Sequence, residues 1–204
     1  MRTNKKTFPA AVVILESVVA PLNWQMIFGR RAPIEVDLGC GDGSFLLARA
    51  TQHPERDFLG IEQMAGRARA TSRKIGAEGL TNARVLQMEV WHALNLLPWD
   101  SVDLFSLLFP DPWPKRRHHN RRVVTREFLR AVARVLKAAG ILQIKTDQSD
   151  YFAAMQSIVP LVPELKEITA RAEAELPLTT FERRFQERGV PIYSLALRKI
   201  SDGK

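Results

Sequence analysis

From residue 34 to residue 159, short apolar segments alternate with segments of helical composition, and this alternation constrains the fold more than any other feature. The strand-like segments are residues 34–38, 58–61, 83–88, 102–109 and 141–145, and the helix-like segments are residues 44–50, 64–77, 123–138 and 151–159, with Gly140 expected to end the third of these helices. Strands that are separated by helices pair in parallel through crossover connections. The sequence therefore predicts an α/β fold with a doubly wound, mostly parallel sheet, to which residues 191–200 add an antiparallel strand.

The chain has 204 residues, which predicts a single domain in which residues 1–33 lead into a core over residues 34–204. Residues 10–20 are apolar and follow three basic residues, as in a signal peptide, but Glu16 interrupts them and no convincing cleavage site follows. We expect this stretch to pack on the domain as a short element. No segment approaches the roughly 18 apolar residues that a membrane span needs, so we expect a cytoplasmic protein.

Charge is the one unusual property of the composition. Thirty Lys and Arg residues against 22 Asp and Glu residues give a net charge of +8, which favours an anionic partner such as nucleic acid or a membrane surface. Cys40 is the only cysteine in the sequence, which excludes an intrachain disulfide and a cysteine zinc site and fits a reducing compartment. His118 and His119 are adjacent and lack a supporting pattern of ligands, so no metal site is expected.

A glycine-rich turn follows the first strand, with glycine at positions 39, 41 and 43. Glycine lets the backbone turn tightly and approach a ligand closely. Glu62 ends the second strand, where a carboxylate can accept both hydroxyl groups of a ribose. The glycine spacing differs from that of the dinucleotide fingerprint. Together, the turn and Glu62 resemble the class I methyltransferases that use S-adenosylmethionine; the alternative is a glycine turn beside a solvated glutamate.

The most specific segment is residues 108–122, which reads LFPDPWPKRRHHNRR. Three prolines restrict the backbone around Asp111 and Trp113, as suits a preorganised site. Five cations follow, and without them the net charge of +8 would fall to +3. A cation cluster beside a rigid loop suggests that a phosphate backbone is held while a base enters a pocket, although a solvated basic turn is the alternative. Because the surplus charge is concentrated here, we expect a nucleic acid partner and no membrane partner.

Several motifs in the same order resemble those of the tRNA (guanine-N7-)-methyltransferase family. They are Asn23-Trp24 with Ile27-Phe28-Gly29 before the first strand, residues 109–115 with the basic run that follows, Thr146-Asp147 after the fifth strand, and residues 179–182 with Gly189 and Tyr193. The resemblance covers nearly the whole chain. It implies a Rossmann-like class I methyltransferase fold, S-adenosylmethionine as cofactor, and methyl transfer to N7 of a guanosine in tRNA, in the variable loop for this family.

The resemblance also implies roles for individual residues. The cofactor site would contain Asp37, Gly39, Gly41, Glu62, Glu89 and Asp111, with Asp111 also the catalytic residue. The target nucleotide would contact Lys115, Asp147, Thr179, Thr180, Phe181 and Glu182, and the RNA backbone would contact Arg116, Arg117, Arg121 and Arg122. The family usually has Glu where this chain has Asp37, and Asp or Asn where it has Glu89, so both positions keep a hydrogen-bond acceptor. A basic N-terminal arm would be reduced to Arg2, Lys5 and Lys6.

The chemistry of guanine N7 suits this set of residues. Its lone pair lies in the ring plane and is unprotonated at neutral pH, so it can attack a sulfonium methyl group without a general base. The protein must then supply alignment and electrostatic stabilisation. Asp111 is the candidate for stabilising the positive charge that develops on guanine, and Asp147 or Glu182 could share this task. Trp113 could stack on a base or pack under its own loop.

Two classes of alternative remain at this point. The first is a methyltransferase that acts on another RNA, a protein or a small molecule, and the second is a non-catalytic RNA-binding protein with the same fold. A monomer and a homodimer are equally compatible with the sequence.

Overall fold

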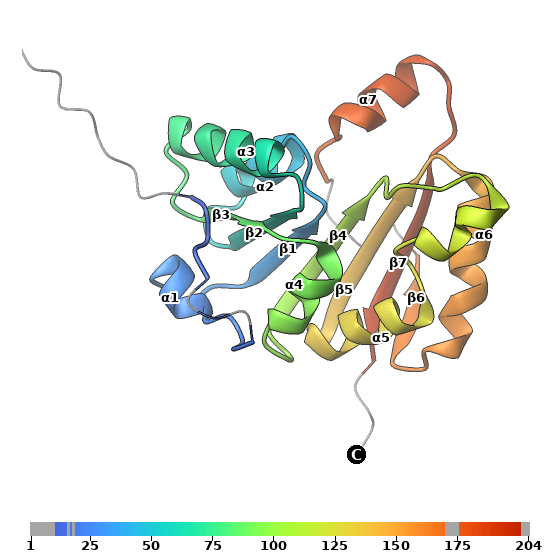
Figure 1. Cartoon of the computed structure of the whole chain (residues 1–204), viewed down its shortest axis with the longest axis horizontal. Coiled ribbons are helices and arrows are strands. Elements are labelled where there is room, and N and C mark those ends of the chain that lie inside the picture. Colours follow the sequence, from blue (N-terminus) through green and yellow to red (C-terminus); the bar gives the residue numbers. More distant parts are fainter. Residues whose placement is uncertain (1–10, 16, 18, 170–175, 201–204) are drawn as a thin grey trace, which may run out of the picture.

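A seven-stranded sheet in the order β3-β2-β1-β4-β5-β7-β6 forms the centre of the computed structural model, which describes residues 11–15, 17, 19–169 and 176–200 (Figure 1). The strands are β1 Ile34–Leu38, β2 Asp57–Glu62, β3 Ala83–Gln87, β4 Val102–Leu108, β5 Leu136–Thr146, β6 Leu165–Ile168 and β7 Tyr193–Lys199. The first five strands pair in parallel, whereas β7 is antiparallel to both β5 and β6. This topology confirms the predicted fold class. The expected N-terminal arm at Arg2, Lys5 and Lys6 lies outside the described residues.

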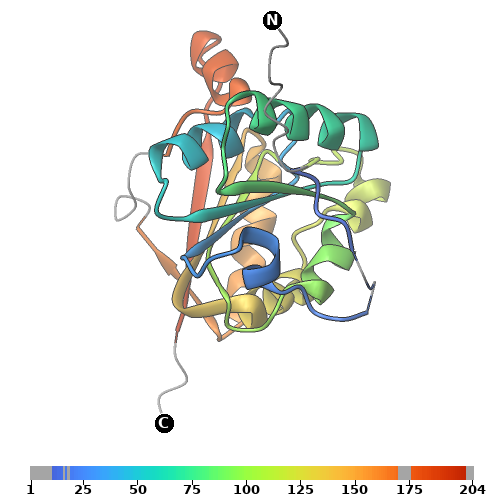
Figure 2. The same ribbon diagram turned by 90° about the vertical axis from the view of Figure 1, so that its left-hand side faces the viewer.

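Helices cover both faces of the sheet (Figures 1 and 2). On one face, Phe58 of β2 belongs to a core cluster with Leu46 and Ile75. On the other, Phe105 of β4 belongs to a larger cluster with Phe128 and other residues from the helices of that side. The helices are α1 Trp24–Phe28, α2 Ser44–Gln52, α3 Ala65–Ala77, α4 Val90–Leu96, α5 Arg126–Val135, α6 Ser149–Ile158 and α7 Thr180–Glu187, with short 3₁₀ helices at Arg116–Arg121 and Val159–Leu161.

The third predicted helix is shorter than its composition suggests, and the role expected for Gly140 is wrong. Helix α5 begins after Thr125, whose side chain accepts a hydrogen bond from the Phe128 N–H, and it ends at Val135. Leu136 is fully buried and already pairs with Val102 as the first residue of β5. Gly140 therefore lies within the strand, where an added Cβ would lie 3.1 Å from the Val102 carbonyl oxygen. The glycine permits this close backbone approach and does not cap a helix.

The N-terminal lead-in packs on the edge of the sheet, as expected for a short element. Val12 forms a parallel bridge with Val85 of β3, and the Val13 N–H donates a hydrogen bond to the Val85 carbonyl at 2.8 Å. This segment therefore covers the outer edge of β3, which would otherwise expose unpaired backbone groups. Within the described part of the chain, no helix is long and apolar enough to cross a membrane.

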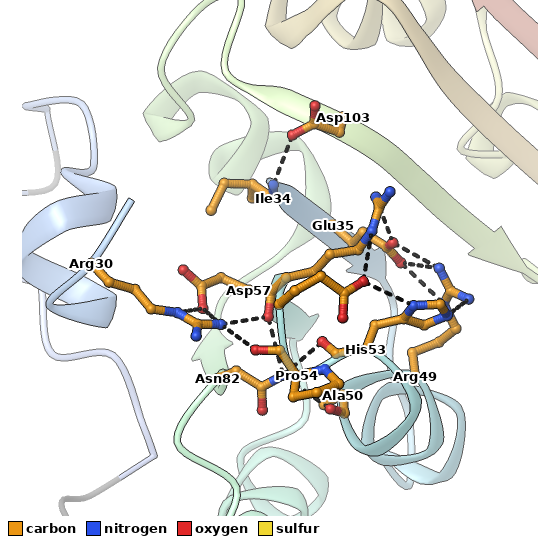
Figure 3. A network of polar contacts seen from close by, with 12 residues as sticks. Arg30, Ile34, Glu35, Arg49, Ala50, His53, Pro54, Asp57, Asn82 and Asp103 are labelled. Atoms are coloured by element: carbon orange, nitrogen blue, oxygen red, sulfur yellow. Dashed lines mark hydrogen bonds and ion pairs between the residues drawn. The ribbon is translucent and has the colours of Figure 1, made fainter. Parts of the chain in front are cut away.

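Buried charges tie the sheet together at the amino ends of β1 and β2 (Figure 3). Arg49 of α2 donates to Glu35 at 2.7 Å, and Arg56 donates to the same carboxylate at 3.1 Å. Beside them, Arg30 forms an ion pair of 2.8 Å with Asp57. Because ligands of parallel α/β sheets bind at the carboxyl ends of the strands, this network lies at the end opposite the expected site and serves stability.

Candidate active site

Two adjacent cavities lie at the carboxyl ends of β1, β2 and β4, beneath α7. The larger, here called the loop cavity, has a volume of about 570 Å³. The smaller, the turn cavity, has a volume of about 210 Å³. The loop cavity is lined by residues that include Glu62, Glu89, Asp111, Trp113 and Arg121, and the turn cavity by residues that include Asp37, Gly39, Thr179, Phe181 and Arg184. The two cavities share lining residues and therefore lie side by side in one site; the shared residues are Gly39, Gly41, Arg67, Leu108, Phe109 and Phe181.

Another cavity, of about 620 Å³, lies beneath the N-terminal lead-in, between residues 12–29 and Arg84. Its described lining is mostly apolar and contains no carboxylate. The predicted chemical groups converge on the loop and turn cavities, so size alone does not identify the site.

The glycine turn is built as its sequence predicts. Gly39, Gly41 and Gly43 have φ angles of 78°, 56° and 76°, a region that other residues rarely adopt. Glu62 is buried below the turn, where its carboxylate accepts hydrogen bonds from the Gly41 N–H at 3.0 Å and the Met64 N–H at 2.7 Å. These bonds fix the orientation of the carboxylate, and each oxygen keeps a lone pair for a ligand hydroxyl group.

Asp37 is the most perturbed carboxyl group of the site. It is 6% exposed, and no described residue donates a hydrogen bond to it. Burial, together with the nearby charges of Glu62 and Asp42, raises the pKa of Asp37 to about 7. A buried, unpaired carboxylate beside a cavity is well suited to a positively charged ligand group.

Cys40 is buried in a small cluster with Ala68 and Val85, although it also belongs to the lining of the turn cavity. Burial raises the pKa of its thiol well above the usual value. A thiol of this kind is a poor nucleophile, so Cys40 serves packing.

Glu89 follows β3 and lies at the start of α4. Its side chain accepts a hydrogen bond from the His92 N–H at 3.2 Å, so it caps the helix. The carboxylate is part of the lining of the loop cavity. Capping and ligand binding are compatible, since a carboxylate offers several acceptor sites.

The proline-rich loop presents Asp111 to the loop cavity. The Asp111 side chain is exposed, and no described residue forms a hydrogen bond with it. Phe109 and Trp113, on either side, have positive φ angles of 56° and 43°, which is unusual for large side chains and costs on the order of 1–3 kcal/mol for each residue. Such strain persists only where the surroundings hold the loop in place, as they do in preorganised sites.

Trp113 packs within its own loop, one of the two roles that the sequence left open, while stacking on a base stays a prediction. The Arg121 guanidinium lies 4.9 Å from the centre of the Trp113 ring, and His118 meets the ring edge at 5.9 Å. Trp113 nevertheless lines the loop cavity. The ring is thus packed within its own loop and still borders the cavity.

The basic segment divides into exposed and buried cations. Lys115, Arg116, Arg117 and Arg121 are exposed, as RNA contacts need to be. Arg122, in contrast, is buried and donates hydrogen bonds to the Pro112 carbonyl and the Asp150 carboxylate. The predicted RNA-backbone contact of Arg122 is therefore replaced by a structural one.

The residues expected to contact the nucleotide near the C-terminus are arranged differently from the prediction. Thr179 and Glu182 form a capping box, in which the Thr179 hydroxyl accepts from the Glu182 N–H at 3.0 Å and the Glu182 carboxylate accepts from the Thr179 N–H at 2.9 Å. Glu182 is 2% exposed and also pairs with Lys145 of β5. Its carboxylate therefore holds α7 in place, whereas Thr179 lines the turn cavity.

Phe181 remains available at the site. It is 56% exposed, lines both cavities and lies 6.1 Å from the ring of Phe109, which Phe185 also contacts at 5.3 Å. The Thr180 side chain lies outside the described part of the structure. Lys115 and Asp147 line neither cavity, and the Asp147 carboxylate accepts a hydrogen bond from the Gln148 amide at 2.5 Å.

Sequence reasoning did not identify two cations of the site. Arg67 of α3 lines both cavities, and Arg184 of α7 lines the turn cavity. The concentration of arginine on residues 64–77 was a signal for Arg67, but nothing in the sequence distinguished Arg184 from its neighbours.

With this geometry in view, comparison with known proteins identifies the family. A family model for methyltransferases, Methyltransf_4, matches residues 31–195. A tRNA (guanine-N(7)-)-methyltransferase from Pseudomonas fluorescens is 35% identical over 198 residues, which cover 94% of this chain and 82% of that protein. One from Leifsonia xyli is 40% identical and covers 88% of this chain and 82% of its own length. The chain belongs to the tRNA (guanine-N7-)-methyltransferase family.

Solved structures agree on the fold. The 16S rRNA methyltransferase KamB has a TM-score of 0.63 at 18% identity, covering 87% of this chain and 93% of its own. The aminoglycoside resistance methyltransferase NpmB1 has a TM-score of 0.59 at 21% identity, covering 82% of this chain and 87% of its own. Family membership confirms the resemblance in the motifs, and these neighbours confirm the class I methyltransferase fold.

Proposed function

We propose that this chain transfers a methyl group from S-adenosylmethionine to N7 of a guanosine in tRNA, in the variable loop as expected for the family. The observation that carries the proposal is that two cavities, one with Asp37 and one with Asp111, lie side by side, with the exposed Arg121 in the lining of the second. The names of the relatives support tRNA as the substrate and N7 of guanine as the methylated atom.

The residues present fit the cofactor. Glu62 keeps free lone pairs that suit the ribose hydroxyl groups, and Glu89 supplies an acceptor for the adenine amino group. Asp37 is a buried carboxylate without a hydrogen-bond partner in the described residues, which suits the ammonium group of the methionine part. When bound, S-adenosylmethionine supplies an electrophilic methyl group on a sulfonium centre.

The task of the protein is alignment and charge stabilisation. Guanine N7 carries its own lone pair, so no residue has to remove a proton before the attack. Asp111 would accept the guanine N1–H and N2–H donors and stabilise the positive charge that the ring acquires. The exposed cations at positions 115, 116, 117 and 121 would hold the RNA phosphates, and Phe181 would border the base at the cavity mouth.

The test is a methylation assay on unmodified tRNA with S-adenosylmethionine. Borohydride and aniline treatment cleaves RNA at N7-methylguanosine, so a single cleavage that maps to the variable loop is expected. An Asp111→Asn variant and a reaction without cofactor are the controls. Absence of cleavage from a protein that still binds S-adenosylhomocysteine would contradict the proposal.

A further inference from the structure

Arg122 is a buried cation at the end of an otherwise exposed basic segment. Its side chain is 7% exposed, whereas Lys115, Arg116, Arg117 and Arg121 lie on the surface. Burial of a guanidinium is costly unless its donors are paired, so a buried arginine within a segment of exposed ones has specific partners.

The partners of Arg122 come from the Asp111 loop and from the first turns of α6. The Arg122 Nε atom donates to the Pro112 carbonyl at 2.7 Å, and its Nη2 atom donates to the Asp150 carboxylate at 2.6 Å. Its guanidinium also lies 4.6 Å from the centre of the Tyr151 ring. Tyr151 in turn accepts a hydrogen bond from the Val124 N–H at 3.1 Å, which fixes the ring against the backbone that follows Arg122.

Both segments lie close in sequence to residues that the family resemblance assigns to the reaction. Pro112 directly follows Asp111. Among the described residues, Arg122 is the one that forms a hydrogen bond with the loop of residues 110–114. Asp150 lies in the first turn of α6, three residues after Asp147. Because Pro110 and Pro112 have no N–H to donate, the loop can form few backbone hydrogen bonds of its own, and the bond from Arg122 to the Pro112 carbonyl anchors it.

We propose that Arg122 is a positioning residue that fixes the Asp111 loop, which lines the loop cavity, against the first turn of α6. This inference rests on the proposed function. The planar guanidinium donates in two directions at once, so it fixes the Asp111 loop relative to the first turn of α6. A lysine at this position keeps the charge but lacks the rigid fork, so it cannot hold both partners in the same geometry.

Substitution of Arg122 should affect turnover, whereas substitution of the exposed cations should affect tRNA binding. Arg122→Lys should lower kcat about 10-fold to 100-fold, since misplacement of a catalytic group by about 1 Å has effects of that size. The KM for tRNA, the affinity for S-adenosylhomocysteine and the salt dependence of tRNA binding should not change. A lower salt slope would mean that Arg122 contacts phosphate, and an unchanged kcat would mean that it positions nothing; either result overturns the proposal.

Asp150→Asn tests the contact between Arg122 and Asp150 from the side of Asp150, which is half-exposed and tolerant of change. It should lower kcat less than Arg122→Lys, and the double variant should be no worse than Arg122→Lys alone, because both changes break one link. Additive losses would show that the two residues act independently and would overturn the proposal. Millimolar guanidinium should restore part of the kcat of Arg122→Ala, which a general loss of stability would not allow.

A measurement without substrate keeps this inference distinct from the proposed function. Hydrogen exchange should accelerate in Arg122→Lys within residues 109–117 and 147–152 together, with the rest of the sheet unchanged. If the wild-type protein fails to methylate tRNA but this paired acceleration appears, the proposed function is wrong and the link is real. If only one of the two segments accelerates, Arg122 does not couple them.

Discussion

Lys145, at the carboxyl end of β5, forms an ion pair with Glu182 in the first turn of α7. Both side chains are largely buried, and Glu182 also caps its own helix through the Thr179 N–H. This arrangement ties a peripheral helix to the central sheet next to the turn cavity. Without the pair, α7 keeps the contacts of Phe181 and Phe185 with Phe109 but loses its polar anchor.

Replacing Lys145 should therefore loosen α7 before it affects the rest of the fold. Lys145→Met leaves the buried Glu182 carboxylate without its cation, and removal of one partner of a buried pair typically costs about 3–5 kcal/mol. We expect faster hydrogen exchange over Thr180–Glu187, with little change in β1 to β4. Lys137→Met, which removes a half-exposed partner of Asp103, is the matched control and should leave α7 unchanged. Equal exchange in α7 of both variants would contradict the anchoring role.

Asp37 should make the stability of the cofactor-free protein depend on pH. Its pKa is raised from 3.8 to about 7, so the folded state holds this proton to higher pH than the unfolded state does. Below about pH 4, Asp37 is protonated in both states and does not lower the free energy of unfolding. As pH rises from 4 to 7, the free energy of unfolding falls by about 4 kcal/mol if the shift acts alone. Urea unfolding between pH 4 and pH 8 measures the loss, and Asp37→Asn should remove it.

Cofactor binding should show the opposite trend with pH. The ionised Asp37 carboxylate attracts the ammonium group of the ligand, so affinity for S-adenosylhomocysteine should rise through pH 7 and level off above it. Between pH 8 and pH 6, we expect a loss of up to about tenfold, since one pKa unit corresponds to a factor of ten. Methylthioadenosine, which lacks the ammonium group, and the Asp37→Asn variant should both bind without this dependence. The same pH profile for the two ligands would show that another group titrates.

Asp111 should matter for turnover and hardly at all for folding. The carboxylate is exposed and has no hydrogen-bond partner among the described residues, so Asp111→Asn leaves no buried group unpaired. Loss of a single electrostatic group at a reacting centre costs about 10²–10³ in rate, and we expect a single-turnover rate lower by that factor. Tm should stay the same. Glu127→Gln, an exposed change on α5, is the control. A single-turnover rate within twofold of wild type would remove Asp111 from the catalytic role.

Lys115 and Arg121 should contribute to tRNA binding in a way that depends on salt. Each phosphate contact that is lost should lower the slope of log K against log salt by about 0.7–0.9. Lys115→Ala and Arg121→Ala are both expected to show this change in filter binding from 50 to 200 mM salt, a range in which the phosphate term dominates. Arg130→Ala, an exposed arginine on α5 that lines neither cavity, should keep the wild-type slope. An equal slope for all four proteins would argue against a phosphate role.

The local sequence was sufficient to predict the buried strands and the residues at their ends. The near-continuous apolar run of residues 102–109, interrupted by Asp103 and Ser106, predicted β4, because a strand buried on both faces favours apolar side chains throughout. Glu62 could be placed because the ends of strands mark the ligand side of a parallel sheet. The boundary at Leu136 could not be placed, since helix and strand favour the same apolar residues there and pairing with Val102 decides.

The local sequence could not predict which charged side chains are buried, because their partners are distant in the sequence. Arg121 and Arg122 are neighbours with the same side chain, yet Arg122 is buried because Asp150, 28 residues later, lies within its reach. Glu182 is buried because its cation, Lys145, lies 37 residues earlier in the chain. Pairs of this separation form only once the sheet brings the loops together, so a motif can name the segment of the site without giving the orientation of each side chain.

The Glu35–Arg49 pair at the other end of the sheet should govern global stability. Both side chains are almost fully buried, and Arg56 remains as a second, half-exposed partner of Glu35. Arg49→Met should therefore cost about 3 kcal/mol, at the lower end for an unpaired buried charge. Glu35→Leu combined with Arg49→Met should recover most of this loss, because no charge is then left buried. Glu55→Gln, at a side chain that is 61% exposed, is the control and should leave stability close to that of the wild type. Urea unfolding at constant m value measures all three, and a double variant no more stable than Arg49→Met would contradict the prediction, because it would show that Arg56 alone compensates the burial of Glu35.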